Sequence, residues 1–155
     1  MSNELYLRKE IEQQDAKDAE QDVRDVRKTQ IKILASNITS AGNVPGLTFN
    51  NLVTGKWYRL YGQMRMFSES NNGVITNINE NSNNLASYFH RNNDGNSQPS
   101  VQGVHVLFKA TGTDVEVNLG AATASAYLAG NNTRSQSWLG IEELNYEIVE
   151  TTDWT

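Results

Sequence analysis

The sequence has no cysteine, only two prolines and no apolar run long enough to cross a membrane. Without cysteine there is no disulfide, no thiolate metal ligand and no cysteine nucleophile, and the redox compartment is left open. Positive charge is also scarce, because 13 Lys and Arg stand against 18 Asp and Glu, for a net charge of -5. Binding to nucleic acid through its phosphates needs clustered basic residues. We therefore expect no nucleic-acid partner and no membrane-embedded segment.

Signatures of catalysis and metal binding are missing as well. The two histidines, His90 and His105, each fall in a predicted strand with no second histidine nearby. Nucleophile-elbow, zinc-protease and phosphate-binding glycine motifs are absent. Glu142 and Glu143 are adjacent in a predicted strand, so they point to opposite faces and do not form a catalytic pair. We expect no enzyme activity and no cofactor, and we interpret this acidic end of the chain as a solvated edge.

Residue types are distributed unevenly along the chain. All 11 glycines and both prolines lie beyond residue 40, whereas the first 36 residues hold about half of the charged ones. A segment rich in Glu, Lys, Arg, Gln and Ala that lacks glycine and proline favours a helix. We predict a helical anchor and stalk over residues 1–36, a linker with the breakers of SNITSAGNVPG over residues 37–50, and a β domain over residues 51–155.

A narrow apolar seam runs along the predicted helix. Its positions, spaced 3, 4, 3, 4 and 3 residues apart, are Ala16, Ala19, Val23, Val26, Gln30 and Ile33. This is the spacing of a coiled coil with one polar layer, and charged neighbours make the seam too thin to hold a helix against a sheet. We predict an intermolecular coiled coil whose order the seam leaves open. The alternatives are a solvated helix lying along the domain and a helix that is disordered in isolation.

The first turns of the predicted helix carry a separate apolar cluster, formed by Leu5, Tyr6, Leu7 and Ile11. These residues are out of phase with the seam, as a stutter in the heptad pattern would cause. We interpret the cluster as a docking segment for another protein.

Beyond residue 51, short apolar runs alternate with turns rich in Asn and Gly. Residues 56–67 (KWYRLYGQMRMF) place Tyr58 and Leu60 on one face of a strand and Trp57 and Arg59 on the other. The pattern predicts further strands over residues 74–78, 85–90, 101–110, 114–119, 125–128 and 138–149. No helical period intrudes, so we predict an antiparallel β-sandwich of the jelly-roll type.

Binding is the class of function that remains, and polar loops are the best candidates for contact. Asn side chains both donate and accept hydrogen bonds, which suits sugar hydroxyls, and exposed loops commonly carry function. The candidate receptor-contact residues are Asn71, Asn72, Asn83, Asn84, Asn93, Asp94, Asn131, Asn132 and Arg134.

The aromatic residues have two possible roles. Rings that could stack on sugars are those of Trp57, Tyr61, Trp138, Tyr146 and Trp154. The alternative is that aromatics fill the sandwich or a subunit interface, which we favour for Tyr58, Phe89, Phe108 and Trp138.

The stretch LVTGKWYRLYG, from Leu52 to Gly62, resembles the L-x-x-G-K-x-Y-R-h-x-G opening strand (h apolar) of bacteriophage receptor-binding domains. A short coiled coil, a brief linker and a compact β domain together also resemble bacteriophage fibre and spike proteins. Such proteins are homotrimers with an N-terminal virion anchor and a distal knob similar to the tumour-necrosis-factor or C1q type. The resemblance implies a mainly β fold with an N-terminal α-helix, in which a trimeric coiled-coil stalk precedes a jelly-roll knob.

The function that this resemblance implies is that of a structural virion protein assembled in the host cytoplasm. It would be a short trimeric fibre or tail protein whose N-terminus docks on other virion proteins and whose knob binds a host-surface glycan or protein. A head fibre or capsid decoration protein is the alternative, as is a non-viral carbohydrate-binding or adhesin module. A polysaccharide depolymerase would need a carboxylate pair in a groove, and the acidic residues of the β half are too scattered for one.

Overall fold

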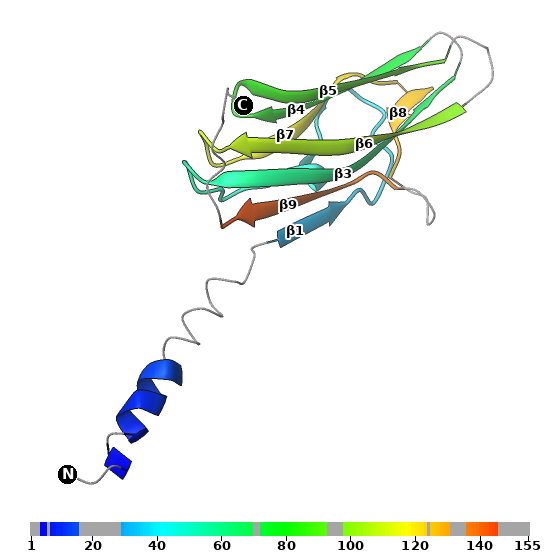
Figure 1. Cartoon of the computed structure of the whole chain (residues 1–155). Coiled ribbons are helices and arrows are strands. Elements are labelled where there is room, and N and C mark those ends of the chain that lie inside the picture. The colour runs from blue at the N-terminus through cyan, green and yellow to red at the C-terminus, as the bar shows by residue number, and fades with distance from the viewer. Residues whose placement is uncertain are drawn as a thin grey trace, which may run out of the picture.

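The computed structural model describes residues 4–5, 7–15, 29–69, 72–92, 98–123, 125–130 and 136–145. It consists mainly of antiparallel β-structure with one short N-terminal helix (Figure 1). Residues 4–5 and 7–15 are helical, and all of them are exposed. In the described part of the chain, no helix is long and apolar enough to span a membrane.

The strands follow one another with short connections. They are β1 (Thr29–Ile33), β2 (Gly42–Asn43), β3 (Trp57–Ser68), β4 (Gly73–Glu80), β5 (Asn83–Arg91), β6 (Gln98–Lys109), β7 (Val115–Ala121), β8 (Ala126–Leu128) and β9 (Trp138–Leu144). A 3-10 turn, η1 (Pro45–Leu47), follows β2.

The strands form two antiparallel sheets that pack face to face (Figure 1). Sheet A has the order β1-β9-β3-β6, with β8 paired to the end of β3, and sheet B has the order β2-β7-β4-β5. Alternate residues of both sheets bury their side chains between the layers. The fully buried residues include Leu60, Met64 and Met66 on β3, Val74 and Ile78 on β4, and Val115 and Val117 on β7.

The strands predicted from residue 56 onward are confirmed, with β3 the clearest case. Tyr58 and Leu60 are buried in the core, and Trp57 and Arg59 lie half-buried on the opposite side, as the period-two pattern predicts. The strands β4 to β9 begin within three residues of their predicted starts. The described part of the last one ends at Leu144, so the rest of its predicted span lies outside the described residues.

The predicted helix does not reach residue 36, because β1 occupies its last part. Gln30 and Ile33, which we assigned to the coiled-coil seam, pair with Ile141 and Trp138 of β9. The β-branched residues of β1 alternate with polar ones, and pairing with β9 adds a stabilisation that helical periodicity cannot reveal. The earlier seam residues lie outside the described residues: Ala16, Ala19, Val23 and Val26.

The predicted linker over residues 37–50 is also wrong, because this segment belongs to the sandwich. Val44, Leu47 and Phe49 are fully buried, and Phe49 exchanges two backbone hydrogen bonds with Val115, of 2.8 and 2.9 Å. Turn residues separate these apolar side chains in the sequence, so no periodic pattern indicates that they are buried together. The β domain therefore begins at Thr29 rather than at residue 51.

The aromatic predictions are confirmed only in part. Tyr58 and Phe108 stack in the core with 5.8 Å between their ring centroids. Phe89 is instead 56% exposed on sheet B, and Trp138 lies half-buried on the outside of sheet A. Tyr146 and Trp154, the candidates for sugar stacking nearest the C-terminus, lie outside the described residues.

A buried carboxylate connects the β4–β5 turn to the β6–β7 loop at one end of the sandwich. Glu80, the last residue of β4, is 2% exposed. It accepts hydrogen bonds from the Thr111 N–H at 2.5 Å, the Gly112 N–H at 2.8 Å and the Thr111 hydroxyl at 2.9 Å. The carboxylate is tolerated in the interior because these donors satisfy it, and it ties the β6–β7 loop to the end of β4.

Replacing Glu80 by alanine should destabilise the domain by about 2–3 kcal/mol, because two backbone N–H groups lose their acceptor. Glu80→Gln keeps one acceptor oxygen and should lose less. The matched control is Glu116→Ala on the outside of sheet B, which should change the free energy of unfolding by less than about 0.5 kcal/mol. Urea unfolding followed by tryptophan fluorescence measures all three. Equal stability of Glu80→Ala and the wild type would contradict this role.

The Tyr58 hydroxyl links the core to the turn before β3. It accepts a hydrogen bond from the Val53 N–H at 2.9 Å and donates one to Glu143 Oε2 at 3.4 Å. Burial raises the pKa of Tyr58 above its ordinary value, the Val53 hydrogen bond opposes the rise, and the Glu143 carboxylate adds to it. Burial likewise raises the pKa of Tyr88. Both phenols are therefore favoured in their neutral form in the folded state.

We expect the melting temperature to decline at alkaline pH because of these tyrosines. Their stabilising effect is complete below the unfolded pKa of about 10 and is lost as the pH rises through the raised folded pKa. Tyr58→Phe should melt lower at neutral pH, since the Val53 N–H loses its acceptor, but its decline above about pH 10 should be shallower than that of the wild type. Thermal unfolding followed by circular dichroism from pH 7 to pH 11 tests this, and parallel declines would contradict it.

Candidate functional site

Three of the predicted receptor-contact residues lie in the described part of the chain, and all three are exposed. Asn72 is in the β3–β4 connection, where its carbonyl accepts a hydrogen bond from the Ser68 hydroxyl. Asn83 and Asn84 are the first residues of β5 rather than loop residues. The other candidates lie outside the described residues: Asn71, Asn93, Asp94, Asn131, Asn132 and Arg134.

The structure does not bring these three residues together. Asn72 immediately precedes β4 and Asn83 follows it after a short turn, so the eight residues of the strand separate them by about 25 Å. A single compact site formed by Asn72 and Asn83 is therefore excluded. Asn84 instead joins other polar residues on sheet B, where its Nδ2 donates to Asn79 Oδ1 at 3.0 Å.

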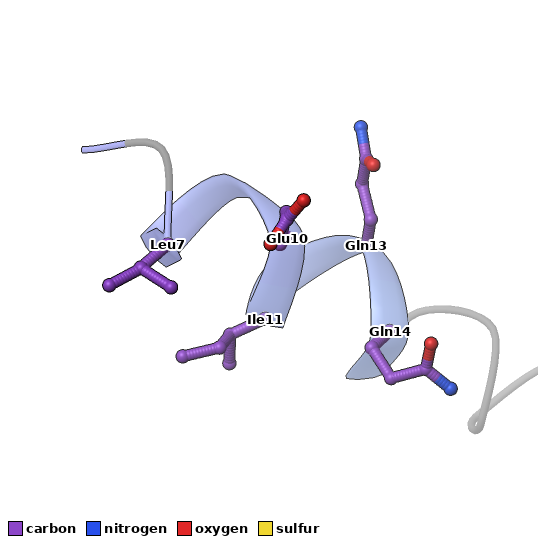
Figure 2. A pocket seen from close by; sticks show the side chains of 5 residues that line it. All are labelled: Leu7, Glu10, Ile11, Gln13 and Gln14. Carbon is purple, nitrogen blue, oxygen red and sulfur yellow. The ribbon is translucent and has the colours of Figure 1, made fainter. Parts of the chain in front are cut away.

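The predicted anchor residues lie on the N-terminal helix, with Tyr6 outside the described residues. Leu5, Leu7 and Ile11 are each about half exposed. Figure 2 shows Leu7 and Ile11 pointing to the same side of the helix, one turn apart, while Gln13 points away from them. The described residues that line the hollow beside them all belong to this helix: Leu7, Glu10, Ile11, Gln13 and Gln14. Such a surface is suited to contact with another helix or protein rather than to enclosure of a small ligand.

The outer face of sheet A gathers aromatic, apolar and arginine side chains. It is formed by the residues that alternate with the buried ones on β3 and by their neighbours in the strand register. By this register the face includes Ile31, Ile33, Trp57, Arg59, Tyr61, Gln63, Arg65, Phe67, Val101, His105, Leu107, Lys109, Tyr127, Trp138 and Glu142.

Four of these side chains are joined across β3 and β9. Arg59 Nη2 is 2.5 Å from Glu142 Oε2, and the Arg59 guanidinium lies 5.3 Å from the centre of the Tyr61 ring. The Tyr61 ring meets Trp138 edge to face, with 5.9 Å between centroids and 80° between planes. Ion pair, cation–π contact and aromatic contact thus hold one another in place. We call Glu142, Arg59, Tyr61 and Trp138 the aromatic–arginine row.

Two glycines allow this row to form. A Cβ atom at Gly140 would approach the Tyr61 ring to 2.6 Å, so the ring lies directly over the Gly140 backbone. At Gly62, with φ of 151°, a Cβ would come within 2.2 Å of the Trp138 carbonyl oxygen. The close approach of β3 and β9 and the position of Tyr61 therefore require the absence of both side chains.

Apolar side chains extend the outer face of sheet A to both edges. Ile31 on β1 and Leu107 and Val101 on β6 are between 48% and 58% exposed. At one end, Phe67 and Tyr127 stack with 4.9 Å between centroids. Exposed apolar surface of this extent around aromatic and arginine residues is typical of a protein–protein interface.

Two hydrogen-bond donors on this face are left without acceptors. Trp57 Nε1 and Arg59 Nε are buried, and neither has a partner among the described residues. A buried donor that lacks an acceptor costs about 1–3 kcal/mol. This cost belongs to the packing of Trp57 and Arg59 within the chain itself.

The described residues provide few groups for chemistry. No three His, Asp or Glu side chains among them are placed to hold a metal ion. As predicted, Glu142 and Glu143 lie on opposite faces of β9, since their partners Arg59 and Tyr58 lie on opposite faces of β3. The predicted solvated edge is wrong for Glu142, which is 5% exposed because it pairs with Arg59.

The sequence contains a signal for this face that strand prediction alone does not use. Trp57 and Tyr61 are candidates for sugar stacking in the sequence, but the contacts of Tyr61 with Trp138 and Arg59 depend on strand register. The signal is that β3 has large apolar or aromatic residues on both of its sides. A strand with one face in water normally alternates between apolar and polar residues, so two apolar sides indicate a second surface that is meant to be covered.

The sequence was compared with protein-family models and with curated proteins. No protein-family model matches the sequence, and no curated protein matches it.

Proposed function

We propose that the protein is a homotrimeric structural protein of a bacteriophage virion, a short fibre or tail protein whose knob binds a host-surface receptor. The observation that carries this proposal is the outer face of sheet A. Its aromatic–arginine row and exposed apolar edges belong to a type of surface that proteins bury against a partner. The resemblance of residues 52–62 to phage receptor-binding domains supplies the biological setting.

The strand order supports a jelly-roll knob of the tumour-necrosis-factor or C1q type. The pairs β4–β5, β3–β6, β2–β7 and β1–β9 are nested, as if one long hairpin were folded over into two layers. Nested pairing distributed over two packed sheets is the arrangement of a jelly roll. In this arrangement β8 is an addition at the end of sheet A.

In the proposed trimer, three copies of sheet A would face the shared axis. Trp, Tyr and Arg are the residues that most often dominate binding energy at interfaces, and all three occur in the aromatic–arginine row or next to it. Arg59 would enter the interface already neutralised by Glu142, which lowers the penalty for removing its charge from water. Ile31 and Leu107 would supply the apolar contact near the two edges.

The N-terminal helix would add the anchor and the stalk. Leu7 and Ile11 form a stripe on one of its sides, which suits docking on other virion proteins. Because β1 begins at Thr29, the proposed coiled coil is limited to the residues before it. Three knobs on one stalk would present three equal receptor sites, and joint engagement would multiply a weak affinity. A head fibre or capsid decoration protein would use the same parts at another place on the virion.

The outer face of sheet A should be required for assembly. The wild type is expected at three times the protomer mass of 17.3 kDa in multi-angle light scattering. Ile31→Asp combined with Leu107→Asp should shift it to the protomer mass, because a buried charge without a partner opposes association by several kcal/mol. The matched control is Ile75→Asp, which makes the same kind of change on the outside of sheet B and should leave the trimer intact.

A wild-type mass of 17.3 kDa would overturn the trimer and favour the carbohydrate-binding or adhesin module. A trimer that survives both substitutions on sheet A would instead place the interface elsewhere. Circular dichroism of each variant separates lost assembly from lost folding.

Deletion of residues 1–12 should abolish incorporation into virions while leaving the β domain folded, because the sandwich begins at Thr29. The expected result is an unchanged melting temperature together with loss of the protein from purified particles, followed by immunoblotting. Leu7→Asp with Ile11→Asp in the full chain should have the same effect. Normal incorporation of these variants would show that the anchor lies elsewhere.

A further inference from the structure

The outer face of sheet B differs from that of sheet A, because amide side chains take the place of aromatic ones. In the strand register, Asn118 of β7 lies opposite both Asn43 of β2 and Asn77 of β4. Asn77 in turn lies opposite Ser87 of β5, so one polar row crosses the whole sheet. We call this row and the next one toward the β4–β5 turn the amide face: Asn43, Asn77, Asn79, Asn84, Ser87, Glu116 and Asn118.

The amide face points away from the core. On β4, Thr76 and Ile78 are buried between the sheets, and Asn77 between them lies on the other side. The same alternation surrounds Asn118 on β7. Ser87 and Asn84 are exposed on β5, the edge strand of the sheet. These side chains therefore face solvent, and their polar atoms that are not bonded within the face can meet a ligand.

Hydrogen bonds within the amide face hold several of its side chains in place. The Ser87 hydroxyl donates to Asn77 Oδ1 at 2.8 Å and lies 3.2 Å from Asn84 Oδ1. Asn84 Nδ2 donates to Asn79 Oδ1 at 3.0 Å. These bonds connect the two polar rows and limit the rotamers of their members. A ligand that binds to a fixed set of groups loses less side-chain entropy on binding.

An exposed aromatic ring lies at one end of the amide face. Phe89 is on the same side of β5 as Ser87, opposite Ile75 of β4, and is 56% exposed. A Cβ atom on Gly73 would approach its ring to 2.9 Å, so the ring lies against the backbone of that glycine. The result is a flat apolar surface next to a set of amides and a hydroxyl.

The stability of the strands does not explain this composition. Asn is depleted in β-strands, and Thr or Val at the same outward positions would favour the sheet more. Here Asn occupies facing positions on three neighbouring strands, β2, β7 and β4. At these positions the protein therefore has side chains of lower strand propensity that can both donate and accept hydrogen bonds.

The chemistry of the amide face matches a neutral polyhydroxylated ligand. Sugar hydroxyls both donate and accept, as amides do, and the C–H side of a pyranose ring packs on an aromatic ring such as Phe89. Glu116 is the one charged residue of the amide face, so the face itself offers no cation for a phosphate or a sulfate. The exposed Arg91, on the same side of β5, lies beyond Phe89 and outside the amide face. Because the face is open, a chain of sugars would lie along it rather than enter a cavity.

We propose that the amide face, together with Phe89, binds a neutral glycan of the host cell surface. This inference deepens the receptor-binding part of the proposed function and rests on it for the source of the glycan. It also moves the receptor site from the predicted loops to the outside of sheet B. The outer face of sheet A lies on the opposite side of the sandwich and stays free for assembly.

An array of purified bacterial surface polysaccharides, with neutral and acidic repeat units in separate sets, tests the proposal on the full chain. We expect binding to members of the neutral set. Asn77→Ala and Phe89→Ala should each weaken that binding about fivefold or more, since each removes one main contact from every site. The matched control is Asn72→Ala, an exposed Asn outside the amide face, which should bind as the wild type does.

Light scattering and thermal unfolding of every variant accompany the array. Should Asn77→Ala melt lower than the wild type, Asn77→Asp preserves the size of the side chain, removes its donor and should also weaken binding. A monomeric wild type that binds neutral glycans through Asn77 and Phe89 would overturn the proposed trimer and leave this inference standing.

Two results would overturn the inference itself. One is a folded trimer that binds no neutral polysaccharide, which would exclude the ligand class without affecting the assembly proposal. The other is neutral-glycan binding that Asn77→Ala and Phe89→Ala leave unchanged while Asn72→Ala weakens it, which would return the receptor site to the loops.

Discussion

The pairing of β3 along both of its edges is the interaction on which the rest of the structure depends. It pairs with β6 over its whole length, with β9 over its first part and with β8 at its end. Where β9 gives way to β8, Ser137 Oγ accepts the Arg65 N–H at 3.0 Å and the Ala129 N–H donates to the Arg65 carbonyl at 2.8 Å. Because β3 is held on both sides, one row of its side chains builds the core and the other builds the outer face of sheet A.

Much of the sandwich could be predicted because its strands from β3 onward obey a local rule. Period-two alternation between turn residues identifies a strand without knowledge of its partners, and the alternation of Tyr58 and Leu60 with Trp57 and Arg59 is confirmed. The segments β1 and β2 could not be found in this way. Charged neighbours and a heptad-like spacing make the Ile residues of β1 look like part of a helix. The segment becomes a strand because it pairs with the edge of β9, which its own sequence does not show.

The two outer faces could not be predicted for a different reason, because strand register decides which side chains become neighbours on each of them. Arg59, Tyr61 and Trp138 come from two strands far apart in the sequence, and Asn43, Asn77 and Asn118 come from three. Alternation predicts that these side chains point outward but not which ones become neighbours. In the sequence alone, a polar residue of a strand cannot be told from ordinary solvent-facing surface, so polar loops are the stronger candidates for contact.

The placement of these two faces on opposite sides of one sandwich constrains how the proposed particle would meet its host. If sheet A turns toward a shared axis, sheet B turns outward, about 10 Å away across the core. Three amide faces would then line the flanks of the knob instead of its tip. Long polysaccharide chains that stand up from a cell surface can lie along such flanks, whereas a flat protein receptor cannot reach all three at once. In this geometry, joint engagement of three sites therefore favours a glycan over a flat protein receptor.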